Sequence, residues 1–339
     1  VPGSFPCPLP IRTDDPDGCP AFFGRAIRGV KTGASPQWLQ DRLLSAGQRP
    51  ISALVDITNY VMLAYGRPAH AYDLAKLSGA VVARRAKDGE EVLALNEKTY
   101  TLDSEMVVIA DDVQVHDIAG IMGGEHSGVS ESTTDVLLEI AYFDPARIGA
   151  TGRKLGLSSD ARTRFERGVD PQLGAMAIER ASQLLQRIAG GRYSPLWCAE
   201  AATQLPPPVA VTLRHASVAR LLGVDIPAEQ TLGVLQRLGL RTSAASDRTA
   251  SEPGAWCFDI PSHRFDLRIE RDLIEEVARI WGYERIAPAP ARSPQMIRSQ
   301  PVVQIPEQRI LDTMSARGFL EGIHFAFVDL AMREGPLTT

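Results

Sequence analysis

Apolar residues recur three and four positions apart in two segments of the first 200 residues, which predicts amphipathic helices there. In SPQWLQDRLLSAG, residues 35–47, Ser35 is placed to cap a helix and Pro36 suits its first position. The segment DPQLGAMAIERASQLLQRIAGG predicts a second helix, with Asp170 as its cap, Pro171 at its first position and a glycine pair at its end.

The stretch between Ala80 and Ala110 has a different pattern. Short β-rich runs (AVVARRA, EVLALN and MVVIA) are separated by turn-forming residues, which predicts a sheet. Two proline-rich stretches indicate boundaries: we interpret residues 1–20 as a linker, and LPPPV at 205–209 ends the segment. Residues 21–204 are therefore predicted to form one α+β domain of mixed sheet and helix.

Residues 205–290 predict a strand, two helices, a pair of strands and a final helix, the order of a small winged-helix-like module. From 209 to 286 there are ten Lys and Arg against eleven Asp and Glu. Such a balance lacks the basic surface that duplex binding requires, so we expect no DNA partner. A second proline-rich linker follows, and residues 291–339 predict the beginning of an incomplete third unit.

The segment RFDLRIERDLIEEVARIWGYERI, residues 264–286, predicts a helix from about Ile269 onward. Its expected buried stripe consists of Leu273, Val277, Ile280 and Trp281. The polar side carries four carboxylates, from Asp266, Asp272, Glu275 and Glu276. Such hard oxygen donors suit magnesium. The alternative is that these acids favour the positive end of the helix dipole while Glu275 pairs with Arg279.

Composition limits the class of protein. The chain has 339 residues, of which 44% are hydrophobic and 23% charged, as in a globular protein of two or three domains. A net charge of -5 argues against coating nucleic acid, so any RNA contact must be local. The four cysteines are far apart, which favours reduced thiols in a cytoplasm, and no apolar run reaches membrane-spanning length. Because the chain opens on Val1, we expect a piece of a longer protein.

Several polar residues stand where they could form a pocket. Glu139 interrupts an apolar strand, where burial requires a partner, although alternation could equally direct it to water. His70 lies in a loop stiffened by proline and could bind a ligand or simply Asp73. Gly120 and Gly123 could allow a ligand close to the backbone or only form tight turns.

Six segments, in this order and spacing, resemble the β-subunit family of bacterial phenylalanyl-tRNA synthetases. They are RPISALVDITNYVM, RPAHAYDL, AGIMGGEHSGV, LLEIAYFDP, GLSSDARTRFERGVDP and PSHRFDLRIERDLIEEVARIWGYERI. The resemblance implies that residues 21–204 are the B3/B4 editing domain and residues 205–290 the B5 domain. It also implies that residues 291–339 begin a class II synthetase-like catalytic domain that makes no adenylate.

The resemblance implies partners as well. The family acts as an α2β2 heterotetramer with tRNA(Phe), and the α subunit binds ATP and phenylalanine. It implies magnesium at the contact with the α subunit, held by Asp266, Asp272, Glu275 and Glu276, and a cytoplasmic location. The alternative function is a non-catalytic scaffold that docks the α subunit and tRNA.

Editing in this family would hydrolyse Tyr-tRNA(Phe), and the resemblance assigns residues to that task. Glu139 would accept the tyrosine hydroxyl, and His70 is the candidate general base. Thr58 and Asn59 would face the amino acid or the terminal adenosine. The pocket backbone and wall would be formed by Gly120, Gly123, Ser159 and Ala161.

Overall fold

The structure is a computed structural model that describes residues 3–243, 254–288, 305–323, 325 and 327. The chain divides into two units, Val1–Ile286 and Ala287–Thr339. In the second unit, the described residues include helix α10 (Glu307–Ala316). Most of the hairpin tip predicted at 243–255, and much of 291–339, lies outside the described residues.

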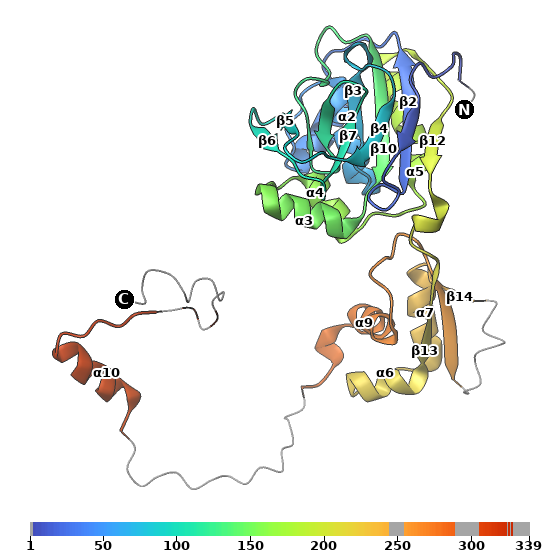
Figure 1. Ribbon diagram of the computed structural model, residues 1–339. Helices are drawn as coiled ribbons and strands as arrows, with labels where there is room; N and C mark the ends of the chain where they lie inside the picture. Colours follow the sequence, from blue (N-terminus) through green and yellow to red (C-terminus); the bar gives the residue numbers. More distant parts are fainter. Residues whose placement is uncertain (1–2, 244–253, 289–304, 324, 326, 328–339) are drawn as a thin grey trace. The chain divides into compact units, whose positions relative to one another are not determined.

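Two sheets form the framework of the first 200 residues (Figure 1). The first sheet has the order β1-β4-β7-β8-β9 and consists of β1 (Ile11–Thr13), β4 (Val81–Arg85), β7 (Val107–Ala110), β8 (Val115–Ile118) and β9 (Met122–Gly123). The second has the order β11-β2-β10-β3, with β12 also on β2, and consists of β2 (Ala21–Arg28), β3 (His70–Asp73), β10 (Asp135–Tyr142), β11 (Arg192–Tyr193) and β12 (Trp197–Glu200). Strand β1 pairs in parallel with β4, and β2 pairs antiparallel with β10.

Helices and smaller elements complete this part. The helices are α1 (Gln37–Ser45), α2 (Ala53–Tyr65), α3 (Pro145–Leu155), α4 (Asp160–Arg167) and α5 (Gly174–Ala189), with short 3-10 turns η1 (Leu74–Lys76) and η2 (Ala202–Gln204). A separate hairpin is formed by β5 (Glu91–Leu93) and β6 (Thr99–Thr101). The predicted strands between Ala80 and Ala110, and the α+β class, are confirmed.

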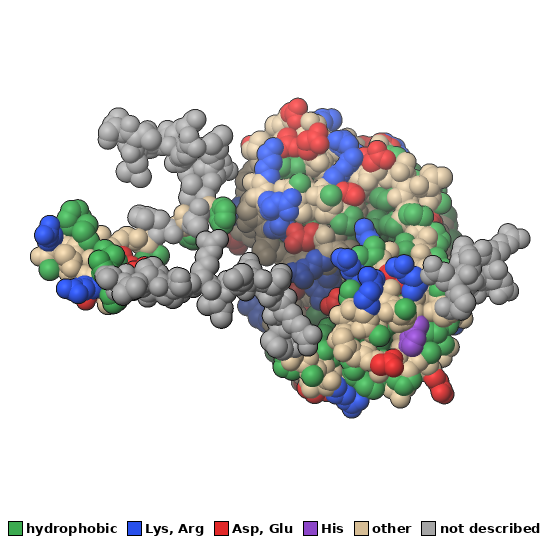
Figure 2. All heavy atoms as spheres, turned by 90° about the horizontal axis from the view of Figure 1, so that it is seen from below, with side chains coloured by type: hydrophobic (Ala, Val, Ile, Leu, Met, Phe, Trp, Pro, Cys, Tyr) green, Lys and Arg blue, Asp and Glu red, His purple; other side chains and the backbone are tan. Residues whose placement is uncertain are grey.

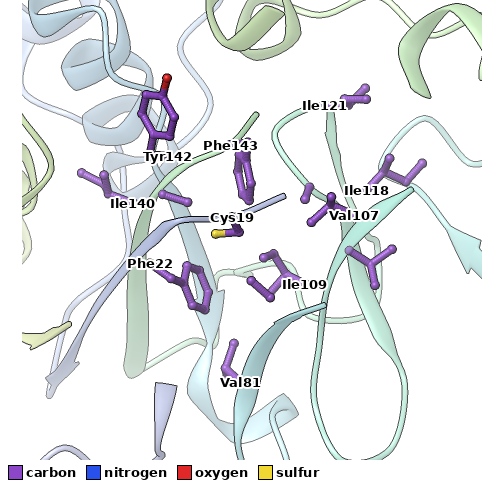
Figure 3. Packing of buried hydrophobic residues seen from close by; sticks show 14 of the residues in the cluster. Cys19, Phe22, Val81, Val107, Ile109, Ile118, Ile121, Ile140, Tyr142 and Phe143 are labelled. Atoms are coloured by element: carbon purple, nitrogen blue, oxygen red, sulfur yellow. The ribbon is translucent and has the colours of Figure 1, made fainter. Parts of the chain in front are cut away.

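The core fills the space between the two sheets. In Figure 3, Phe22 of the second sheet faces Val81 and Ile109 of the first, with the buried Cys19 beside them, whereas Ile140 points to the other side of its sheet. The opposite face of the second sheet packs against α1, α2 and α5 through a separate buried cluster. Strand β10 is therefore covered on both faces, and seven of its eight residues are buried.

Details at the ends of elements differ from the sequence prediction. Helix α1 forms with Leu39 and Leu43 buried, but the Ser35 hydroxyl donates to Asp56 instead of capping the helix. Helix α5 begins only at Gly174, because Asp170 closes a turn by accepting the Gln172 amide. Both differences arise from side chains that found other hydrogen-bond partners.

The interpretation of residues 1–20 as a linker is also corrected. Ile11–Thr13 form β1, which adds a parallel edge strand to β4, and the Ile11 side chain is buried. The Trp197 indole donates to the Ile11 carbonyl at 2.7 Å. Regular structure thus begins before Ala21. The sequence pattern does not reveal this strand, because three residues beside prolines are too few to show a period of two.

Residues 205–290 contain the predicted order of elements. They are β13 (Val209–Arg214), α6 (His215–Leu222), α7 (Ala228–Arg237), β14 (Arg241–Thr242), β15 (Ala255–Ile260), α9 (Glu270–Trp281) and η3 (Tyr283–Arg285). The sheet has the order β13-β15-β14. Its core joins Leu213, Phe258 and the α9 residues Leu273 and Val277. The winged-helix-like class stays a prediction, as does the synthetase-like class of the following unit.

The buried face of α9 is rotated from the predicted stripe. Leu273 and Val277 are buried as expected, but Ile280 is 42% exposed and Ile274 is buried in its place. Helix α9 packs against α6, α7 and β13, so a wider face than one i, i+4 stripe is covered. Among the described helices, none combines the length and the apolar character needed to cross a membrane.

Candidate functional site

A cavity of about 90 Å³ lies among the ends of β3, β7, β8, β10 and α4. Side chains from both sheets line it, so strands far apart in the sequence contribute to one site. The structure brings together five of the residues predicted for the pocket, namely His70, Gly120, Gly123, Glu139 and Ala161. It adds Asp117, which the sequence analysis missed.

Glu139 points into the protein rather than toward water. The residue is 7% exposed, and its Oε1 atom has no hydrogen-bond partner in the described part of the chain. Burial first, and then the negative charge of Asp117, raise the pKa of Glu139 to about 8, while Arg67 opposes them. The outward alternative fails because β10 is covered on both faces, so alternation along this strand does not separate core from solvent.

His70 lies directly across from Glu139, its partner in the antiparallel pairing of β3 with β10. Its side chain is 28% exposed, but the Nε2 atom is buried without a hydrogen-bond partner among the described residues. Nε2 lies 3.9 Å from Asp117 Oδ2. The alternative contact with Asp73 does not form, because Asp73 caps η1 and accepts the Thr133 hydroxyl at 2.6 Å.

Asp117 is held in place by two donors. Its Oδ2 atom accepts the hydroxyl of Tyr72, and its Oδ1 atom accepts the backbone amide of Gly124 at 2.9 Å. Tyr72 lies two residues after His70 on β3, and the two rings meet edge to face with centroids 4.5 Å apart. The signal for Asp117 is weaker than that for Glu139, since VHDI has four residues of which His116 and Asp117 are polar, whereas Glu139 interrupts a long apolar run in DVLLEIAY.

A second missed residue, Arg67, is fully buried near these carboxyl groups. Its Nη1 donates to the Asp170 carbonyl at 3.1 Å, while Nε and Nη2 have no partner among the described residues. Burial lowers the pKa of Arg67 to about 10, against the charges of Asp170 and Glu139. An arginine in this environment stays charged near neutral pH and balances part of the negative charge of the cavity.

The two predicted glycines lie where side chains leave no room. A Cβ atom on Gly123 would meet His70 Cε1 at 2.9 Å, so the ring packs directly on the backbone. Gly120 has a φ of +67°, and a Cβ atom there would meet Phe143 at 2.8 Å. Both positions therefore need glycine for space, and Gly120 needs it for its backbone as well.

The other predicted residues have different places. Ser159 does not line the cavity: it caps α4 and donates to the Ile121 carbonyl at 2.7 Å, which fixes the wall formed by Ile121 and Ala161. On α2, the Thr58 hydroxyl donates to the Val55 carbonyl at 2.7 Å. Neither Thr58 nor Asn59 is among the described residues that line the cavity.

The acidic residues predicted to hold magnesium engage arginines instead. Arg264 lies between two of them, with Nη2 2.7 Å from Asp266 Oδ2 and Nη1 3.0 Å from Glu276 Oε2. Arg279 contacts Glu276 at 2.6 Å rather than pairing with Glu275. Hydrogen bonds from Arg279 and then Arg264 lower the pKa of Glu276, which keeps it ionised against these cations.

Asp272 follows the helix-terminus alternative. Asp272 Oδ2 accepts the backbone amides of Arg268 and Ile269 at 2.7 and 2.9 Å, which caps the start of α9. Across the described residues, no three His, Cys, Asp or Glu side chains are grouped so as to hold a metal ion. This arrangement does not fit magnesium as it stands, and the magnesium site with Glu275 stays a prediction.

Comparison with known proteins agrees with this architecture. The family model of the B3/4 domain matches residues 18–190, and that of the tRNA synthetase B5 domain matches residues 211–283. The phenylalanine–tRNA ligase beta subunit of Novosphingobium aromaticivorans is 50% identical over 333 residues, covering 97% of this chain and 40% of that protein. That of Yersinia pestis is 43% identical over 323 residues, covering 95% and 40%.

A third relative, from Mesorhizobium japonicum and with the same description, is 42% identical and covers 97% of this chain and 40% of its own length. The chain thus spans about 40% of the length of these relatives. Because the B3/4 model covers half of the chain and the relatives align along nearly all of it, the chain belongs to the B3/4-domain family, in the form found in phenylalanine–tRNA ligase β subunits.

Proposed function

We propose that this chain is the editing part of a phenylalanine–tRNA ligase β subunit and that its cavity hydrolyses Tyr-tRNA(Phe). One observation carries the proposal: a buried carboxyl group, Glu139, presents an unpartnered oxygen in a cavity that also contains His70. An unsatisfied buried polar atom costs about 1–3 kcal/mol, so a site retains one where a ligand supplies the partner. The hydroxyl of a tyrosyl group is such a partner.

A second site is needed because phenylalanine and tyrosine differ by one hydroxyl. An apolar synthetic pocket rejects an added hydroxyl by only about a hundredfold. A pocket with a polar group at its inner end has the opposite preference, since phenylalanine leaves that group unpaired. Glu139 hydrogen-bonds the tyrosine hydroxyl and so admits the wrong amino acid for hydrolysis, while correctly charged tRNA is spared.

The remaining residues have supporting roles in this proposal. His70 activates or orients the attacking water, and Gly123 leaves space for its ring. Ala161 is small and lines the cavity. Thr58 and Asn59 on α2 contact the ester or the terminal adenosine outside the cavity. Hydrolysis needs only an oriented water and a polarised carbonyl, so the mechanism requires no covalent intermediate with the protein.

The partners belong to the whole ligase. We propose that residues 21–204 edit, that residues 205–290 form a winged-helix-like B5 domain, and that residues 291–339 begin the synthetase-like domain. The partner α subunit, in an α2β2 heterotetramer in the cytoplasm, binds ATP and phenylalanine and charges tRNA(Phe). On the face drawn in Figure 2, Lys and Arg side chains are interspersed with Asp and Glu. Such mixed charge does not favour binding of RNA over a broad surface, so we expect the RNA contact to be local.

Deacylation tests the proposal directly. The full-length β subunit with its α subunit is mixed with tRNA(Phe) charged with tyrosine or phenylalanine. We expect selective loss of tyrosine, and we expect Glu139→Ala to remove the selectivity. Hydrolysis of neither ester would favour the alternative function, a scaffold that docks the α subunit and tRNA. Retained hydrolysis of Tyr-tRNA(Phe) by His70→Ala would exclude His70 as the general base and leave it a positioning residue.

A further inference from the structure

The cavity contains two carboxyl groups with opposite hydrogen-bond environments. Both oxygens of Asp117 accept a donor, one from the Tyr72 hydroxyl and one from the Gly124 amide. Glu139 Oε1, in contrast, is buried without a partner among the described residues. The two groups line the same cavity of about 90 Å³, although they lie on different sheets.

Two buried carboxyl groups that line one cavity do not readily both stay ionised. Donors stabilise the charged form of one group, and the other then takes up a proton because burial and a like charge both oppose its ionisation. Asp117 has the donors and Glu139 has none at Oε1, so the hydrogen bonds themselves identify which group holds the proton. These donors favour the charged form at Asp117, whereas Glu139 lacks such support at Oε1.

We propose that Asp117 is a positioning residue that keeps Glu139 protonated, so that a neutral carboxylic acid faces the tyrosine hydroxyl. This rests on the proposed function of the cavity. A neutral carboxylic acid can accept a hydrogen bond from the phenol hydroxyl at its carbonyl oxygen and donate a hydrogen bond to the phenol oxygen from its own hydroxyl. It also does not attract the ammonium group of the aminoacyl ester, which an ionised glutamate deep in the cavity would do.

Other titratable groups also surround Glu139. Arg67 is buried nearby and lowers the pKa of Glu139, but the combined effect of burial and Asp117 is larger and raises it to about 8. Across β3, His70 is the strand partner of Glu139. Burial first, and then the charge of Asp117, raise the pKa of Tyr72, and burial raises that of Cys19, so these two groups stay neutral.

Infrared spectroscopy of the intact ligase tests the protonation state without using activity. A protonated carboxylic acid has a carbonyl stretch that an ionised carboxylate lacks. We expect the difference between wild type and Glu139→Gln at pH 7 to contain this band, and the band to disappear as the pH rises past about 8. A difference spectrum without the band at pH 7 would overturn the proposal.

The role of Asp117 is tested by the same band. In Asp117→Asn we expect it to disappear at least about one pH unit lower, because the like charge is gone. Tyr72→Phe keeps the ring but removes a donor from Asp117, so Asp117 competes for the proton and the band weakens at pH 7. If the band disappears at the same pH in both variants as in wild type, Asp117 does not control the protonation of Glu139.

Deacylation separates this inference from the proposed function. If a neutral group recognises the hydroxyl, Glu139→Gln should keep the preference for Tyr-tRNA(Phe) within about tenfold, whereas Glu139→Ala should lose it. If Glu139→Gln loses the preference for Tyr-tRNA(Phe) as fully as Glu139→Ala, recognition requires an ionised carboxylate and the inference fails. A wild-type ligase that shows the band but does not prefer tyrosine would refute the proposed function and leave Glu139 protonated.

Discussion

The hydroxyl of Tyr72, on β3 of one sheet, donates a hydrogen bond to the carboxylate of Asp117, on β8 of the other. Both residues are buried, and the contact lies beside the cavity that contains His70 and Glu139. The bond therefore links the two sheets at the point where each contributes residues to the site. It connects the stability of the domain with the electrostatics of the pocket.

Tyr72→Phe should lower the free energy of unfolding by about 1–3 kcal/mol, because a buried carboxylate oxygen loses its donor while the ring packing is kept. Urea unfolding of the two proteins measures the difference. Tyr142→Phe is the matched control: Tyr142 is also buried, on β10, but its hydroxyl has no hydrogen bond among the described residues. An equal loss in both variants would argue against a specific role for the Tyr72 bond.

Glu139→Gln should stabilise the protein increasingly as the pH rises from about 5 to 8. The pKa of Glu139 is raised from 4.5 to about 8, so between these values the folded state keeps a proton that the unfolded state has lost. Stability then falls with rising pH, by about 1.4 kcal/mol per unit at most. Glutamine has no such proton, so the difference between variant and wild type should grow with pH.

Urea unfolding at several pH values between 5 and 8 provides this comparison. Carboxyl groups elsewhere titrate alike in both proteins, so their contributions cancel in the difference. A constant difference across this range would mean that Glu139 is ionised in the folded state. That result would also contradict the hydrogen-bond assignment of the proton.

The sequence predicted elements better than it predicted partners. Helix α1 and the strands between Ala80 and Ala110 follow from periodicity, which is a local property. Ser35 was assigned to the helix that follows it, yet its hydroxyl bonds Asp56, 21 residues further on. A cap and a distant partner have the same residue type, so the sequence alone does not distinguish them.

In the candidate site, too, the local pattern indicated single residues but not which residues they would meet. An apolar strand interrupted by Glu139 indicated a special carboxylate, but whether it faced the core depended on the helices that cover β10. Asp117 gave a weaker signal in a strand of only four residues, too short for a period to be clear. Their meeting in one cavity depends on how the two sheets pack, which no local pattern contains.

Gly123→Ala should reduce deacylation of Tyr-tRNA(Phe) by about 10- to 100-fold, because displacement of a catalytic group by about 1 Å has effects of this size. The added Cβ would lie 2.9 Å from His70 Cε1 and 3.0 Å from Leu95 Cδ1, so the His70 ring must move. The backbone of Gly123 is not left-handed, so the change acts through space in the pocket rather than through strain.

Gly33→Ala is the control for this variant, since nothing lies within 4 Å of a Cβ atom there and its backbone is likewise not left-handed. Rates for tyrosyl and phenylalanyl esters are compared in the intact ligase, beside thermal unfolding of each variant. We expect Gly33→Ala to match wild type in both. Wild-type deacylation by Gly123→Ala would show that the position of the His70 ring does not matter.

Magnesium should bind this chain weakly or not at all, because Arg264 and Arg279 already pair with Asp266 and Glu276, and Asp272 caps α9. Addition of a chelator should therefore leave the free energy of unfolding unchanged within about 0.5 kcal/mol. Titration calorimetry with magnesium chloride, on wild type and on Arg264→Gln, measures the affinity directly. Removing Arg264 frees Asp266 and leaves Glu276 paired only with Arg279, so we expect binding to increase in the variant. Submillimolar binding by wild type that disappears in Asp266→Asn would instead mean that the ion displaces Arg264 and that the predicted magnesium site exists.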